Sequence, residues 1–126
     1  QGFPFYGADF TYKIPLNCEK DCDVKVSATL FDAAVVTAKI DGKDAGTIAW
    51  CPYSIEIKNL KSGKHELELT AHVSRVNTFG GLHACLDIPW KGPNYWYTHG
   101  AEWAYEYQLK ETGILKSPVI KYFNKK

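Results

Sequence analysis

Residues 77–101 combine the residue types that could bind a ligand. This segment holds four of the ten Gly, two of the six Pro and two of the four Trp residues of the chain. The alternation of apolar and polar residues seen elsewhere stops here. A long irregular segment in a compact domain is usually either functional or wrongly assigned as irregular; we expect a binding site in it.

The aromatic and polar residues of this region fit the chemistry of carbohydrate recognition. A pyranose presents an apolar C–H face, which stacks on a flat aromatic ring, and hydroxyl groups, which planar polar side chains can hydrogen-bond in pairs. The predicted carbohydrate-binding residues are Trp96, Tyr95, Trp90, Tyr97, Arg75, Asn77 and His83, and Asn94 and His99 are further suitable polar partners.

A structural role is the alternative for the same residues. The Trp and Tyr side chains could close one end of the fold, and His83 could be a buried histidine with satisfied hydrogen bonds. Arg75 and Asn77 could brace the turn at residues 79–81 through hydrogen bonds to its backbone. The sequence leaves both interpretations open.

The carboxylates of this segment do not form a catalytic pair. Glycoside hydrolysis needs two carboxyl groups about 5–10 Å apart, and the spacing of Asp87 and Glu102 does not pair them. Motifs for a nucleophilic serine or a phosphate-binding loop are absent from the sequence. We therefore predict no catalytic residue and no metal ligand.

Cys18, Cys22, Cys51 and Cys85 leave three chemistries open. Cys18 and Cys22 are close enough for a disulfide around a turn. They could instead form half of a zinc site that a histidine completes. All four could also be free thiols, so the cysteines do not decide the compartment.

A period of two dominates the rest of the chain and predicts half-buried antiparallel strands. In residues 65–73, for example, Leu67, Leu69, Ala71 and Val73 share one face, and Glu66, Glu68, Thr70 and His72 share the other. The predicted strands cover residues 10–14, 23–31, 34–40, 45–50, 55–57, 65–73 and 103–109.

These strands predict an all-β fold, an antiparallel β-sandwich formed by residues 1–126 as one domain. Asp41-Gly42 predicts a hairpin turn, and residues 61–64 predict a second turn. Val24, Val26, Ala28 and Leu30 are expected to point inward. The aromatic residues expected in the core are Phe10, Tyr12, Trp50, Trp103, Tyr105 and Tyr107.

Composition narrows the class of protein. The net charge is +1, with 15 basic and 14 acidic residues, so we expect neither a nucleic-acid nor a membrane partner. No apolar run approaches the roughly 20 residues of a membrane helix. The sequence contains no Met, and we interpret it as a domain cut from a longer chain.

Several short motifs are shared with a known family of domains: the Asp41-Gly42-Lys43 turn, Gly46, Pro52-Tyr53, Gly63-Lys64-His65, the Arg75/Asn77 and Phe79-Gly80-Gly81-Leu82-His83 segment, Trp90-Lys91-Gly92-Pro93, and residues 107–118. With these motifs the chain resembles the galactose-binding-like β-sandwich (jelly-roll) domains that are appended to large bacterial glycoside hydrolases. The resemblance covers roughly residues 5–120 and departs from the pattern at Gly81, where Pro is more usual.

The segment around Arg75 and His83 is similar to C-terminal domains of α-L-rhamnosidase-related proteins. The resemblance implies a non-catalytic accessory domain, which either binds carbohydrate weakly or packs on and stabilises the catalytic domain of the same chain. It implies no cofactor; a structural calcium ion would fit the family, but no Asp-rich loop indicates one. The alternative is a cell-surface adhesion or protein-interaction module of the same architecture.

Overall fold

The computed structural model describes residues 2–85, 95–96 and 98–124. The chain forms two compact units, which we treat separately. The sandwich unit comprises Asp9–Val73 and Thr112–Lys126, and the loop unit comprises Gln1–Ala8 and Ser74–Glu111.

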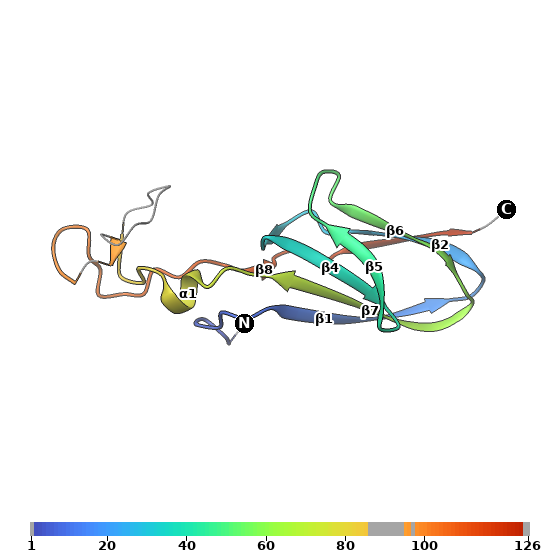
Figure 1. The fold of residues 1–126 in the computed structure, drawn as a ribbon, viewed down its shortest axis with the longest axis horizontal. Helices are drawn as coiled ribbons and strands as arrows, with labels where there is room; N and C mark the ends of the chain where they lie inside the picture. The colour runs from blue at the N-terminus through green and yellow to red at the C-terminus, as the bar shows by residue number, and fades with distance from the viewer. Residues whose placement is uncertain (1, 86–94, 97, 125–126) are drawn as a thin grey trace. The chain divides into compact units, whose positions relative to one another are not determined.

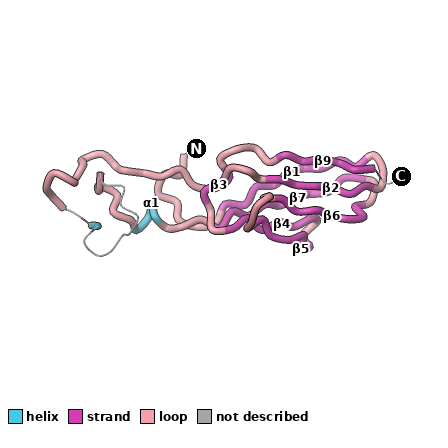
Figure 2. Tube along the Cα trace, turned by 90° about the horizontal axis from the view of Figure 1, so that it is seen from above, coloured by secondary structure: helices cyan, strands magenta, loops and turns pink. Residues whose placement is uncertain are grey.

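The sandwich unit contains two main antiparallel sheets (Figures 1 and 2). The four-stranded sheet has the order β1 (Phe10–Cys18), β7 (Gly63–His72), β4 (Val35–Ile40) and β5 (Lys43–Ile48). The three-stranded sheet has the order β6 (Ser54–Leu60), β2 (Cys22–Ser27) and β9 (Val119–Asn124). A short pair joins β3 (Phe31–Asp32) to β8 (Gly113–Ile114).

The core of this unit lies between the inward faces of the two sheets. Successive side chains of a strand point to opposite faces, so every second residue is buried. Leu67, Leu69 and Ala71 of β7 are fully buried, as are Val24 and Val26 of β2. The predicted antiparallel β-sandwich is confirmed.

The predicted turns are also confirmed. Asp41 and Gly42 join β4 to β5 with φ angles of +50° and +76°. Two successive positive φ angles define the turn that matches the twist of paired strands, and an Asp-Gly pair adopts them readily. The turn before the Leu67/Leu69 strand lies between Leu60, the end of β6, and Gly63, the start of β7.

Two residues expected in the core are exposed. β5 ends at Ile48, and Trp50 lies in a turn closed by the hydrogen bond from the Tyr53 N–H to the Trp50 carbonyl (2.7 Å), where its side chain is 85% exposed. β2 ends at Ser27, so Leu30 lies beyond the last buried position, Ala28, and is 52% exposed. In both cases alternation continues in the sequence after the strand has ended.

The loop unit differs from the prediction more strongly. It contains the short helix α1 (Val76–Phe79), and no helix in the described residues is long and apolar enough to cross a membrane. Residues 103–109 do not form the predicted strand, although Trp103 makes an isolated bridge to Ala84. Tyr105 is 83% exposed and Tyr107 is 55% exposed, so their assignment to the core was wrong.

Among the described residues, none forms a strand beside residues 103–109, and this explains the difference. Backbone hydrogen bonds connect residues 102–108 to residues 82–85 at irregular intervals: Cys85 N–H donates to Glu102, Ala104 N–H to His83 and Gln108 N–H to Leu82. A strand buries one face only when backbone hydrogen bonds to a neighbouring strand hold it in a sheet. Without such strand pairing, alternating aromatic residues have no core to face.

His65 joins two turns at one end of the sandwich unit. Its Nδ1 lies 2.6 Å from Asp41 Oδ2, and its Nε2 lies 2.8 Å from the Lys61 carbonyl oxygen. Both partners accept hydrogen bonds, so both ring nitrogens donate and the ring is a cation. The Asp41 carboxylate, followed by the Lys61 carbonyl, raises the pKa of His65.

This contact predicts a pH-dependent stability. Because the folded pKa of His65 is raised, its contribution is fully present below the unfolded pKa of about 6.5 and is lost as pH rises through the folded pKa. His65→Gln should therefore destabilise the protein most at pH 5.5 and progressively less at alkaline pH. Urea denaturation between pH 5 and 9 measures this difference.

His99→Gln is the control, because His99 is exposed and hydrogen-bonds the hydroxyl of the adjacent Thr98. The control should leave the pH dependence of unfolding unchanged. A difference in unfolding free energy between His65→Gln and the native protein that stays constant across the whole pH range would contradict a stabilising role of the charged His65 ring.

Candidate functional site

Asn77 anchors the loop unit from the first turn of α1. Its Nδ2 donates to the Lys110 carbonyl (2.7 Å), and its Oδ1 accepts from the Lys110 N–H (2.9 Å). The side chain is buried, with 5% of its surface exposed. Asn77 thus pairs with backbone as a neighbouring strand would, and both of its polar groups are already used.

Arg75 supports the same helix through its backbone. Its carbonyl accepts hydrogen bonds from the N–H groups of Thr78 (3.0 Å) and Phe79 (2.9 Å), and its side chain is exposed and makes no capping hydrogen bond. The predicted bracing by side chains is therefore made by Asn77, and its target is Lys110 and not residues 79–81.

His83 is fixed by hydrogen bonds and by aromatic neighbours. Its Nδ1 lies 2.9 Å from the Ala104 carbonyl oxygen, which can only accept, so this nitrogen carries the proton. Its ring stacks on Trp103 at 5.4 Å between centroids and contacts Tyr107 at 4.9 Å. These contacts match the structural role considered for His83.

The contacts of His83 belong to a longer row of rings, which we call the aromatic ladder: Phe5, Tyr107, His83, Trp103 and Tyr105. Phe5 and Tyr107 meet edge to face at 5.0 Å, and Trp103 and Tyr105 do so at 5.8 Å. Three of these rings are exposed: the side chains of Phe5, Tyr107 and Tyr105 are 44%, 55% and 83% exposed. The ladder is thus an aromatic surface held by its own ring contacts.

Sequence reasoning did not find this ladder. It assigned Trp103, Tyr105 and Tyr107 to the core and gave Phe5 no role. Phe5 is far from Tyr107 in sequence, and its carbonyl is held by the Thr78 hydroxyl (2.8 Å). The available signal was the density of aromatic residues at 103–107. It does not predict their exposure, because exposure depends on whether another strand pairs with this segment, and the sequence does not show that.

Tyr95 is a buried part of the loop unit. It is 6% exposed, and its ring and carbonyl lie so close to Gly81 that a Cβ atom on Gly81 would overlap them. A larger residue at position 81 would therefore displace Tyr95. In this position Tyr95 presents no open ring face, and it supports the neighbouring Trp96 through an edge-to-face contact.

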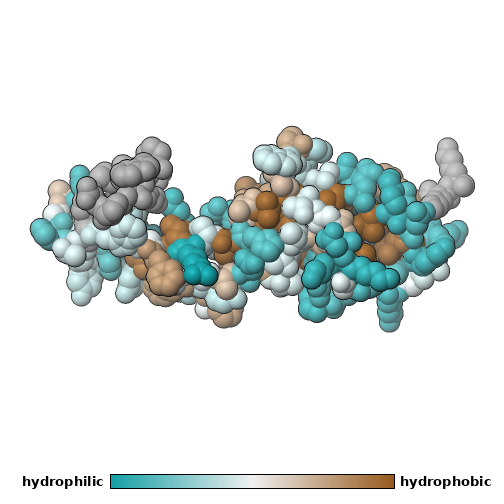
Figure 3. All heavy atoms as spheres, viewed as in Figure 1, coloured by the Kyte–Doolittle hydropathy of each residue, from teal (hydrophilic) through white to brown (hydrophobic). Residues whose placement is uncertain are grey.

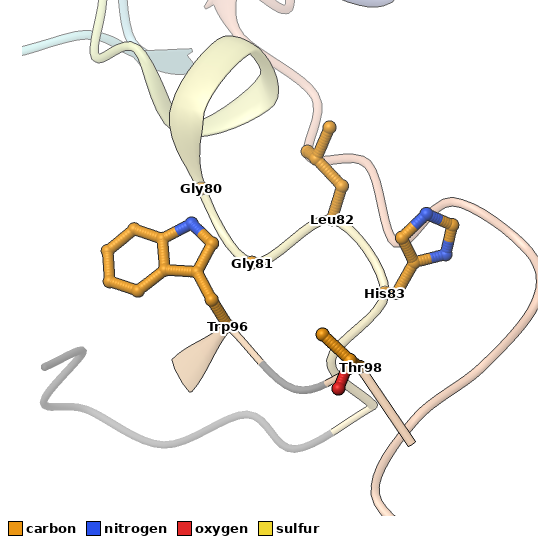
Figure 4. A pocket seen from close by; sticks show the side chains of 6 residues that line it. All are labelled: Gly80, Gly81, Leu82, His83, Trp96 and Thr98. Carbon is orange, nitrogen blue, oxygen red and sulfur yellow. The ribbon is translucent and has the colours of Figure 1, made fainter. Parts of the chain in front are cut away.

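Trp96 borders an open hollow of about 270 Å³. The indole is 53% exposed, and its Nε1–H donates to the Phe79 carbonyl (3.1 Å). Figure 4 shows the Leu82 and His83 side chains pointing away from Trp96. The hollow is lined by Gly80, Gly81, Leu82, His83, Trp96 and Thr98.

The described residues that line the hollow offer a ring and few polar side chains. Thr98 is exposed beside it, and its hydroxyl is shared with His99. Trp90 and Tyr97 lie outside the described residues, as do Asn94 and Asp87. The predicted set is therefore brought together only in part, and carbohydrate binding by it stays a prediction.

The carboxyl groups with a shifted pKa do not have the environment of a general acid. A glycosidase acid needs a raised pKa. The pKa values of Asp41, Glu56 and Glu68 are instead lowered, chiefly by hydrogen bonds from His65, Lys58 and Lys13, respectively. Within the described ranges, no group of three or more His, Cys, Asp or Glu residues could hold a metal ion.

The structure resembles parts of larger enzymes. A rhamnosidase from a Novosphingobium species matches with a TM-score of 0.62 and 17% identity, over 92% of this chain and 11% of that chain. This chain thus spans about a tenth of the length of the rhamnosidase. At this identity the likeness shows the fold alone.

Two structures of a GH2 beta-galacturonidase from Eisenbergiella tayi also match, one bound to glycerol and one to galacturonate. Their TM-scores are 0.46 and 0.45 at 24% and 22% identity, and each match covers 69% of this chain and 15% of that chain. No protein-family model matches the sequence, and no curated protein matches it.

The Asn77 contact predicts a local loss of stability. Asn77→Ala removes both hydrogen bonds between this side chain and the Lys110 backbone, which should cost about 1–3 kcal/mol of unfolding free energy. We expect faster hydrogen exchange at residues 76–80 and faster proteolysis within the loop unit. Arg75→Ala is the matched control, and equal proteolysis rates in the two variants would show that Asn77 is not the anchor.

Proposed function

We propose that this chain is a non-catalytic accessory domain of a glycoside hydrolase, and that its loop unit packs against the rest of that enzyme. The fold resembles a region that makes up about a tenth of a rhamnosidase chain, and this supports the proposal that the present chain is part of a larger enzyme. The exposed aromatic surface of the loop unit is the observation that carries the packing role.

The described part of the loop unit buries few side chains. Among its described residues, the buried ones are Asn77, Gly81, Ala84 and Tyr95. The large apolar side chains that it exposes are Phe3, Phe5, Tyr6, Phe79, Trp96, Tyr105, Tyr107 and Leu109. Figure 3 shows hydrophobic side chains at the surface over α1.

The contrast between few buried residues and many exposed apolar side chains favours a partner that covers this surface. Ordering each residue costs about 1–2 kcal/mol, and burial of apolar area is the main term that offsets it. A unit that orders its backbone but leaves its rings in water gains little from that term. Large exposed apolar patches mark interaction sites, and aromatic residues are enriched at protein interfaces.

The alternation of ring orientations along the aromatic ladder favours a protein partner. Phe5 and Tyr107 are tilted by 79°, and Trp103 and Tyr105 by 88°, so the ladder does not offer one flat platform to a long glycan.

Docking can be tested with the catalytic region of the hydrolase that carries this domain, expressed separately and mixed with this chain. We expect a complex by size-exclusion chromatography with light scattering. Tyr105→Ser removes the most exposed ring of the ladder and should weaken association at least tenfold, about 1.4 kcal/mol. Calorimetric titration measures the affinity.

Trp50→Ser is the control for this experiment, because Trp50 is equally exposed, at 85%, but lies in the sandwich unit. It should leave the affinity unchanged. Failure of the two proteins to associate, or equal weakening by both substitutions, would overturn docking through the loop unit.

The half-exposed indole of Trp96 beside its hollow favours a second candidate function, weak carbohydrate binding. The face of this ring could stack on one sugar, as proposed for the predicted site. Titration with L-rhamnose and galacturonate is the direct test, and we expect dissociation constants in the millimolar range.

Trp96→Ala should abolish this binding, whereas Trp96→Phe keeps a flat ring and should retain most of it, because stacking needs the ring face and not the Nε1–H group. Trp50→Ala again controls for the loss of an exposed indole. Absence of heat with either sugar, or binding that survives Trp96→Ala, would remove carbohydrate recognition from this site.

A further inference from the structure

Cys18 and Cys22 lie where the chain crosses from one sheet to the other. Cys18 is the last residue of β1 in the four-stranded sheet, and Cys22 is the first residue of β2 in the three-stranded sheet. They are 4% and 2% exposed and belong to the same core cluster. The two thiols therefore sit on the inward faces of both sheets at one end of the sandwich.

The turn between these residues is held in place. The Asp21 carboxylate accepts hydrogen bonds from the Ser62 N–H (2.9 Å) and from Lys61 Nζ (2.8 Å), both in the turn between β6 and β7. The turn that carries one thiol toward the other is thus tied to a second crossing of the two sheets. This restricts the separation of Cys18 and Cys22 in the folded protein.

The environment of the Cys18 thiol agrees with this placement. Burial, followed by the interaction with the Cys22 thiol, raises the pKa of Cys18 to about 11. The other two cysteines differ in both respects: Cys51 and Cys85 are exposed, and they lie in different units of the chain.

We propose that Cys18 and Cys22 are a site of reversible oxidation, at which a small disulfide such as oxidised glutathione converts them into an intrachain disulfide that staples the two sheets. One cysteine thiolate attacks the glutathione disulfide and releases one glutathione thiolate. The second cysteine thiolate then attacks the mixed disulfide and releases the other. Two protons leave the cysteines, and the oxidant becomes two molecules of reduced glutathione.

The burial of the pair governs how fast it reacts. Only a thiolate attacks a disulfide, and the raised pKa of Cys18 keeps it protonated at neutral pH. Oxidation of the folded protein should therefore be slow at pH 7 and accelerate as pH rises. Transient opening of the turn between β1 and β2, or folding in the presence of the oxidant, gives the same product.

The experiment uses a chain in which only this pair remains, Cys51→Ser with Cys85→Ser. Incubation with oxidised glutathione at pH 8.5 should lower the intact mass by about 2 Da and remove both thiols titrated after denaturation. The melting temperature should rise by about 5 °C, because the cross-link restricts the unfolded chain. Adding reductant should restore the original melting temperature.

The same chain with Cys22→Ser is the matched control, which should gain only the mass of one glutathione and show no rise in melting temperature. If the serine variants fail to fold, peptide mapping of the oxidised native protein answers the same question through a linked Cys18–Cys22 peptide. A stable glutathione adduct on either cysteine, an unchanged mass, or a disulfide that leaves the melting temperature unchanged would each overturn the proposal.

Discussion

Burial of one face of each sheet against the other is the constraint on which the sandwich unit depends. The side chains of β7 and β2 that meet this requirement, such as Leu69 and Val26, are completely buried. At one end, His65 and Asp21 satisfy polar groups of the turns that cross between the sheets. The cysteine pair lies at one of these crossings, so its chemistry is governed by the same burial.

The loop unit is built on a different principle. Asn77 and His83 hydrogen-bond backbone groups of distant segments, and the rings stack on one another instead of entering a common core. Satisfying the buried backbone is obligatory, but it contributes less stability than apolar burial. The exposed aromatic ladder is a consequence of this arrangement, and it is the observation on which we base the proposed packing against a larger partner.

The alternation of apolar and polar residues predicted side-chain burial correctly where a strand lies between other strands. It placed Leu67 and Leu69 inward correctly, because β7 lies between β1 and β4. The same pattern failed at Tyr105 and Tyr107, because no strand in the described part of the chain pairs with this segment. It also failed at Trp50, because the strand ends two residues earlier. Strand β9 was not predicted, although its residues 119–124 complete the three-stranded sheet.

The sequence alone determined the all-β class, the Asp41-Gly42 hairpin and the inward faces of the central strands, because period and turn chemistry are local properties of the chain. Only the tertiary structure decided which aromatic residues are buried. Tyr95, expected to face a ligand, fills the space above Gly81, whereas Tyr105, expected in the core, is exposed. Burial depends on contacts between segments far apart in sequence, and residue type and spacing do not specify those contacts.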